Sequence, residues 1–116
     1  MVDKDYLFSP SEVIKLVGEE GVSELLAEYQ TLLRQHLALP LPSLGEGITE
    51  TFFRSVHSLK SSSQFIGASA LSDLCLQLET ECKNNEVCSG HLLSLALQVR
   101  KYVKELDGQV AGYLSV

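Results

Sequence analysis

A run of apolar residues at helical spacing, with a histidine on the opposite side, constrains this chain more than any other feature. The members recur at steps of three and four, which stacks them on one face of an α-helix. They are Ile48, Phe52, Val56, Leu59 and Ile66, with Ser63 as the one polar position in the series. At about 100° per residue, His57 points roughly 145° away from the centre of that face. We therefore predict a helix that buries the apolar face and presents His57 to solvent.

Ser43 and Glu46 have the spacing of a capping box, which places the start of this helix near Leu44. Gly67 can adopt the left-handed conformation that ends it after Ile66. The same apolar spacing, bounded by caps, glycines and prolines, predicts four further helices. Their approximate ranges are Ser9–Val17, which stops at Gly18, then Glu19–Leu37, Ser69–Lys83 and Ser89–Gly112.

Four long amphipathic helices joined by short connections favour antiparallel neighbours. The sequence therefore predicts an all-α fold, an antiparallel up-down-up-down four-helix bundle with a short extra N-terminal helix as a lid. A chain of 116 residues is long enough for one core and too short for two ordinary domains. We expect a single helical bundle domain over residues 1–116.

The formal net charge of −6, with no Lys/Arg cluster to offset it, argues against nucleic acid and anionic membrane surfaces as partners. No apolar run reaches the roughly 18 residues of a membrane span, and Met1–Asp5 lacks the basic start of a secretory leader. The expectation is a soluble, cytoplasmic protein. Cys75, Cys82 and Cys88 are odd in number, which suits reduced thiols, and the first two fit small core residues better than zinc or redox ligands.

His57 could act as a nucleophile, because a neutral imidazole is competent near pH 7. Lys60 follows one helical turn later on the same face and would attract an anionic group such as a phosphoryl. Arg54 lies on the other flank, and Ser61 and Gln64 can donate hydrogen bonds to phosphoryl oxygens. The sequence has no glycine-rich phosphate loop, and this helix has no paired acidic metal site, which argues against a nucleotide as the direct donor.

At these residues the chain resembles the histidine-containing phosphotransfer (HPt) family, whose signature reads H-x-x-K-G-S-S-x-x-x-G-A-x-x-L, followed by a helix ending in L-E. The matching run is His57-Ser58-Leu59-Lys60-Ser61-Ser62-Ser63-Gln64-Phe65-Ile66-Gly67-Ala68-Ser69-Ala70-Leu71, then Leu74-Cys75 and Leu78-Glu79. The motif spans about a quarter of the chain, and the four-helix pattern agrees with the family over nearly all of it.

The resemblance implies that His57 is phosphorylated, on Nε2, and that Lys60 steadies the phosphoryl group in a two-component phosphorelay. It implies as partners response-regulator receiver domains and a hybrid sensor histidine kinase, with Mg²⁺ and the acidic catalytic residues on the receiver. The protein would be a monomeric phosphocarrier without independent catalytic activity, needing no cofactor or metal of its own. The start at Met1 favours a free-standing protein over the tail of a hybrid kinase.

Two positions depart from the family pattern: Ser61 replaces the usual glycine, and Gln64 stands where a small residue is common. Both bear on which receivers can dock. Ser62 and Ser63 lie at or near the inward stripe, where small residues allow close helix packing. Phe53 is either an exposed anchor for a receiver or packed beneath the N-terminal helix.

The alternative function is a degenerate HPt-like helical module that binds receivers or a kinase without carrying phosphate. A metal-binding bundle is a distant third, because no E-x-x-H pair is present. We interpret His36 as a solvated residue at a helix C-terminus. His91 and Glu79 are interpreted as capping or surface groups outside the site.

Overall fold

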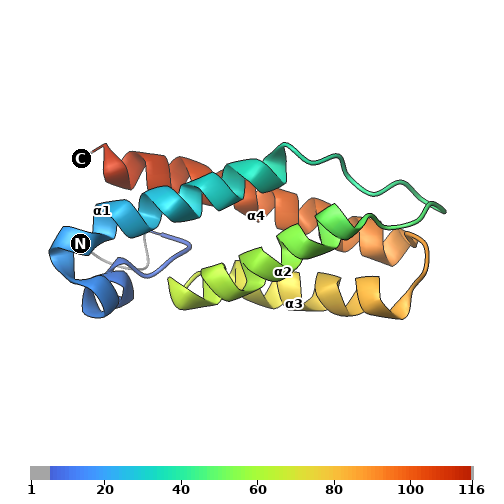
Figure 1. The fold of residues 1–116 in the computed structure, drawn as a ribbon, viewed down its shortest axis with the longest axis horizontal. Helices are drawn as coiled ribbons and strands as arrows, with labels where there is room; N and C mark the ends of the chain where they lie inside the picture. Colours follow the sequence, from blue (N-terminus) through green and yellow to red (C-terminus); the bar gives the residue numbers. More distant parts are fainter. Residues whose placement is uncertain (1–5, 116) are drawn as a thin grey trace.

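Four helices, packed in a ring in chain order, make up the described part of the chain, residues 6–115 of a computed structural model (Figure 1). They are α1 (Pro10–Leu37), α2 (Glu50–Phe65), α3 (Ser69–Asn84) and α4 (Gly90–Leu114). Each contacts its neighbours in sequence, and α1 also packs against α4, which closes the ring. The predicted all-α, up-down-up-down bundle is confirmed. The prediction drawn from Met1–Asp5 concerns residues outside the described range.

Gly18 divides α1 into the predicted short helix and the long one, because its backbone leaves the helical region at φ 73° and ψ 167°. The short helix begins at the predicted cap, where Ser9 Oγ accepts a hydrogen bond from the Glu12 amide. It closes one end of the bundle, since the Ser9 amide donates to the Ile66 carbonyl at 2.9 Å. Gly67, at φ 76°, ends α2 as predicted, and a Cβ there would lie 2.6 Å from the Ser9 Cβ.

The start of α2 was predicted wrongly: the helix begins at Glu50, capped by the Thr49 hydroxyl, and not near Leu44. Gly45 has a φ of 79°, which a continuing helix cannot contain. Its amide donates to the Cys88 carbonyl at 2.9 Å, so the capping-box spacing lies in a loop paired with the connection between α3 and α4. The first connection, residues 38–49, is accordingly longer than predicted.

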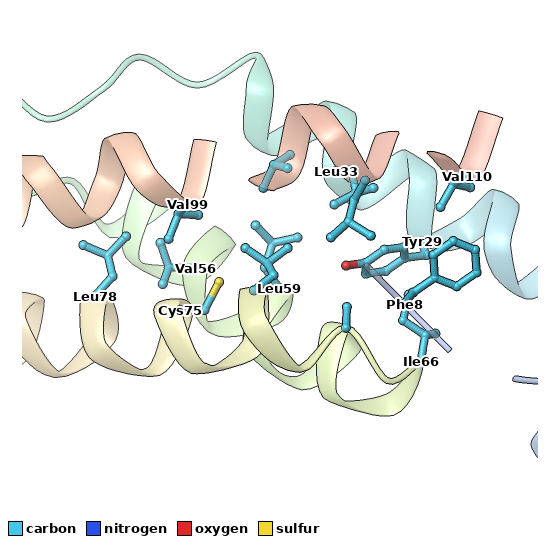
Figure 2. Close-up of a cluster of buried hydrophobic side chains, with 14 of the residues drawn as sticks. Phe8, Tyr29, Leu33, Val56, Leu59, Ile66, Cys75, Leu78, Val99 and Val110 are labelled. Carbon is cyan, nitrogen blue, oxygen red and sulfur yellow. The ribbon is translucent and has the colours of Figure 1, made fainter. Parts of the chain in front are cut away.

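The apolar stripes of the four helices meet along the axis of the bundle. Figure 2 shows Val56 of α2 close to Leu78 of α3 and Val99 of α4, and Leu59 farther along the same core. All four side chains are buried. Truncating a buried leucine such as Leu59 to alanine typically costs about 2 to 5 kcal/mol. This packing fixes the rotation of α2 about its own axis and therefore which residues it presents outward.

His36 is buried, which contradicts its interpretation as a solvated residue. It continues the inward stripe of α1, three residues after Leu33, and its Nδ1 lies 2.8 Å from the Ser55 hydroxyl of α2. Its ring also stands beside the Phe52 ring. Burial, with a further contribution from the Arg100 guanidinium, lowers the pKa of His36 to about 4. His36 is therefore a neutral core residue at pH 7.

The three cysteines are unpaired thiols within the described chain. Cys75 and Cys88 are buried and Cys82 is half-buried, as expected for small apolar side chains. Burial raises the pKa of Cys75 to about 12, with a smaller contribution from the Glu79 carboxylate. None of the helices between residues 6 and 115 has the length and apolar character needed to cross a membrane.

Candidate functional site

His57 stands on the outer ridge of α2 with 58% of its side chain exposed. Val56 and Leu59, which come before and after His57 in the sequence, point inward and are buried. Their packing holds His57 in this orientation. The prediction that His57 faces solvent is confirmed. An imidazole in this position can meet a partner without any rearrangement of the core.

A carboxylate from the neighbouring helix holds both His57 and Lys60. Glu79 Oε2 in α3 lies 2.5 Å from His57 Nδ1, and Glu79 Oε1 lies 2.9 Å from Lys60 Nζ. A second lysine, Lys83, approaches the same Oε1 at 3.5 Å. The Glu79 side chain is only 4% exposed. A buried carboxylate needs such partners, because the desolvation of an unpaired charge costs on the order of several kcal/mol.

The protonation of Glu79 decides which nitrogen of His57 is reactive. Burial by itself raises the Glu79 pKa, but the hydrogen bonds from Lys60 and His57 outweigh it and lower that pKa to about 2. Glu79 is therefore ionised at neutral pH and can only accept hydrogen bonds. His57 Nδ1 must then carry the proton that it shares with Glu79. In the neutral ring this leaves the lone pair of Nε2 free to act as a nucleophile.

Lys60 lies on the side of His57 that faces α3. Its side chain is 22% exposed, and its backbone carbonyl accepts a hydrogen bond from the Ser72 hydroxyl at 3.0 Å. Lys60 is therefore tied to α3 twice, through its ammonium group to Glu79 and through its carbonyl to Ser72. The ammonium group thus has a fixed place one helical turn from His57.

Four other candidates do not enter the Glu79 cluster. The Arg54 guanidinium pairs instead with Glu50 at 2.6 Å, one turn earlier on α2, and both side chains are 75% exposed. Ser61 and Gln64 are exposed on the His57 side of the helix. Phe53 is half-buried in the first turn of α2, whereas the N-terminal segment contacts the last turn of α2. Packing of Phe53 beneath the N-terminal helix is therefore ruled out.

The small residues predicted for close packing lie between α1 and α2. Ser63 is buried, and its hydroxyl lies 2.7 Å from the Tyr29 hydroxyl of α1. Burial raises the pKa of Tyr29, which keeps its phenol protonated as a hydrogen-bonding group. Ser62 is half-buried beside the same helix. Both serines position α2 against α1 and do not contact His57.

Glu79 is the residue of this cluster that the sequence analysis missed, since it was interpreted as a surface or capping group. Two signals pointed to it: it is the last residue of the L-E pair in the family motif, and it follows Ser72 and Cys75 at helical spacing. Its interpretation as a surface group is wrong. His91 is 67% exposed and lies 3.2 Å from Glu81, away from the Glu79 cluster.

Across residues 6–115, His, Cys, Asp and Glu side chains do not gather in the threes that a metal ion would need. A family model described as "Hpt domain" matches residues 20–109, a span that contains His57, Lys60 and Glu79 and leaves out the short N-terminal helix. Neither the curated proteins nor the solved structures include a match to this chain.

Proposed function

The chain belongs to the histidine-containing phosphotransfer (Hpt) domain family, and on that premise we propose that His57 carries a phosphoryl group in a phosphorelay. Hpt domains serve in phosphotransfer within two-component signalling as carriers without catalytic activity of their own. The donor would be a receiver-domain aspartate or a kinase, and the acceptor another receiver. The observation that carries the proposal is the exposed His57 ring with its Nδ1 held by the buried Glu79 carboxylate.

The proposed transfer is a displacement at phosphorus. The Nε2 lone pair of His57 attacks the phosphorus of an aspartyl phosphate, the N–P bond forms as the P–O bond breaks, and aspartate leaves as a carboxylate. The ring then carries a proton on Nδ1 together with a positive charge. The Glu79 carboxylate, 2.5 Å from Nδ1, offsets that charge. The reverse steps return the phosphoryl group to a second receiver.

Lys60 has two tasks in this proposal. Its ammonium group stabilises Glu79 as an anion, and it places a positive charge one helical turn from His57, which favours an anionic phosphoryl group on that ring. Ser61 and Gln64, both exposed next to His57, supply hydrogen-bond donors for the phosphoryl oxygens. We assign the exposed Arg54 to receiver docking and not to the phosphoryl group, because its charge is already balanced by Glu50.

The remaining requirements fall on the partners. We expect Mg²⁺ and the acidic catalytic residues to belong to the receiver domain, and a hybrid sensor histidine kinase to supply the phosphoryl group. A monomer in the cytoplasm fits this role, and the unpaired thiols of the described chain are consistent with a reducing compartment.

The test is phosphoryl transfer from a panel of radiolabelled receiver domains from the same genome. We expect at least one receiver to label the wild-type protein, in a linkage that is labile to acid and stable to base. His57→Gln should remove the label and keep the helical circular dichroism spectrum, because the side chain is exposed. Labelling that survives in His57→Gln would refute the assignment.

The alternative, an Hpt-like module that only binds, is decided by the same panel. It requires a receiver that binds the wild-type protein and His57→Ala with equal affinity and transfers no phosphoryl group to either. Transfer to His57 from any receiver excludes it.

A further inference from the structure

A groove runs along the bundle between α1 and α2, on the side of His57 away from Glu79. It consists of two hollows of about 300 and 450 Å³ that share Leu32 of α1 as a wall. The groove forms because α1 packs less extensively against α2 than α3 does. Ser61 lines one hollow and Ser58 the other, so the groove borders His57 along the length of α2.

The floor of the groove is apolar and reaches the surface at Phe65. Leu25, Leu32 and Ile66 line the smaller hollow together with Phe65, which is 51% exposed. An exposed aromatic side chain beside a hollow is the kind of residue that anchors a protein partner.

The rim of the groove on α1 is acidic. Glu28 lines the smaller hollow, and Glu24, one turn earlier, is exposed on the same helix. With the described residues, neither side chain forms an ion pair or a hydrogen bond. Arg54, at the other end of the groove, is already neutralised by Glu50. The groove therefore offers uncompensated negative charge at the Phe65 end only.

We infer that this groove selects the receiver partner, by taking a receiver helix that presents an apolar side chain to Phe65 and a lysine or arginine to Glu28. The inference rests on the proposed function, because a receiver seated in the groove would lie next to His57. Charge complementarity assigns the occupant: an acidic rim favours a basic surface and repels an acidic one, which sets partner choice more than total affinity.

Two variants with matched controls test the two parts of the groove. Phe65→Ser removes the anchor, and Leu97→Ser is its control, because Leu97 is 49% exposed on α4, across the bundle from α2. Glu28→Arg reverses the charge of the rim, and Glu105→Arg makes the same change on α4. All four side chains are exposed, so the variants should fold as the wild type does.

The first measurement is phosphotransfer kinetics with the receiver that labels His57 fastest. We expect Phe65→Ser and Glu28→Arg each to raise KM by about tenfold while leaving kcat unchanged, as for lost docking contacts. The two controls should leave KM within about twofold of wild type. A receiver in which the basic residue is changed to glutamate should recover transfer to Glu28→Arg and lose it to the wild type.

The second measurement is receiver binding followed by amide chemical shifts, and it does not require transfer. Shifts of groove residues that disappear in Phe65→Ser and Glu28→Arg support the inference even if His57 is not labelled. Three results overturn it: a bound receiver that leaves the groove signals unshifted, wild-type binding by both groove variants, or no binding by any receiver. Labelling of His57 without groove shifts would leave the phosphocarrier function intact and refute the groove alone.

Discussion

Two histidines each make a side-chain contact through Nδ1, one in the buried core and the other on the surface. His36 Nδ1 meets the Ser55 hydroxyl in the core, where the residue is 1% exposed. His57, two positions after Ser55 on α2, turns to the other side of the helix, and its Nδ1 meets the Glu79 carboxylate with 58% of the side chain exposed. Each imidazole joins two helices, but only the ring of His57 stands where a partner can reach it.

The difference lies in the charge of the partner as much as in exposure. A hydroxyl can donate or accept, so Ser55 places little constraint on which nitrogen of His36 carries the proton. An ionised carboxylate can only accept, so Glu79 fixes the Nδ1 proton of His57 and leaves Nε2 free. A charged partner on one nitrogen of an exposed histidine fixes which nitrogen is free to react. A buried histidine with a neutral partner remains structural.

The largest expected effect is the loss of folding stability that His36 causes as the pH falls. Its pKa falls from 6.5 to about 4 on folding, so below pH 6.5 the unfolded chain binds a proton that the folded chain refuses. Stability is fully present above pH 6.5 and should fall by about 3 kcal/mol as the pH approaches 4. Urea unfolding at a series of pH values measures this. Glu79 acts in a lower window, losing its contribution only as the pH falls from 4.5 toward 2.

His36→Gln and His57→Gln separate the two histidines in that titration. We expect His36→Gln to flatten the pH dependence of unfolding between 6.5 and 4, and His57→Gln to retain the slope that His36 causes. Equal slopes in wild type and His36→Gln would show that the buried ring is not the source.

The next largest effect is expected at Glu79. Glu79→Gln keeps the size of the side chain and removes the charge that fixes the Nδ1 proton, so phosphotransfer should slow by about 10- to 100-fold through lost orientation. Ring nitrogen chemical shifts of His57 should move from a single Nδ1–H tautomer toward a mixture. A slower transfer with an unchanged tautomer would mean that Glu79 acts only through stability.

Lys60 and Lys83 both approach Glu79 and provide a matched pair. Lys60→Gln removes the ammonium group that lies 2.9 Å from Glu79 Oε1, one helical turn from His57, and should slow transfer by about tenfold. Lys83, at 3.5 Å and 61% exposed, contributes little, and Lys83→Gln should stay within about twofold. Rapid-quench transfer kinetics compare the two variants. Equal losses would remove Lys60 from any specific contact with the phosphoryl group.

The smallest effect is expected for the exposed pair of Arg54 and Glu50. Arg54→Ala should change the free energy of unfolding by less than about 0.5 kcal/mol, because surface ion pairs contribute little. As a docking neighbour Arg54 should change KM by no more than about twofold, and kcat for transfer to His57 should stay unchanged. A marked slowing of transfer would place Arg54 at the phosphoryl group itself.

The direction of His57 followed from the sequence because the buried stripe of α2, which runs from Phe52 to Ser63, fixes the rotation of the helix. Gly18 and Gly67 likewise predicted where helices end, because both have a positive φ that a helix cannot contain and that glycine adopts readily. The start of α2 did not follow. The capping-box spacing at Ser43 is local, whereas the pairing of Gly45 with Cys88 joins segments distant in the chain.

The roles of His36 and Glu79 depended on what faced them. Each continues an inward helical stripe, but a polar residue at such a position is usually solvated unless a neighbouring helix supplies a hydrogen-bonding partner. Those partners, Ser55 for one and His57 with Lys60 for the other, come from α2, and periodicity within a single helix carries no information about them.

The central claim is that Glu79 holds Nδ1 so that Nε2 of His57 receives the phosphoryl group. The most direct test is nuclear magnetic resonance of the phosphorylated protein with nitrogen-15 in its histidines, which detects the nitrogen coupled to phosphorus. We expect coupling to Nε2 of His57, with a proton still on Nδ1. Coupling to Nδ1, or to the ring of His36 or His91, would contradict the account.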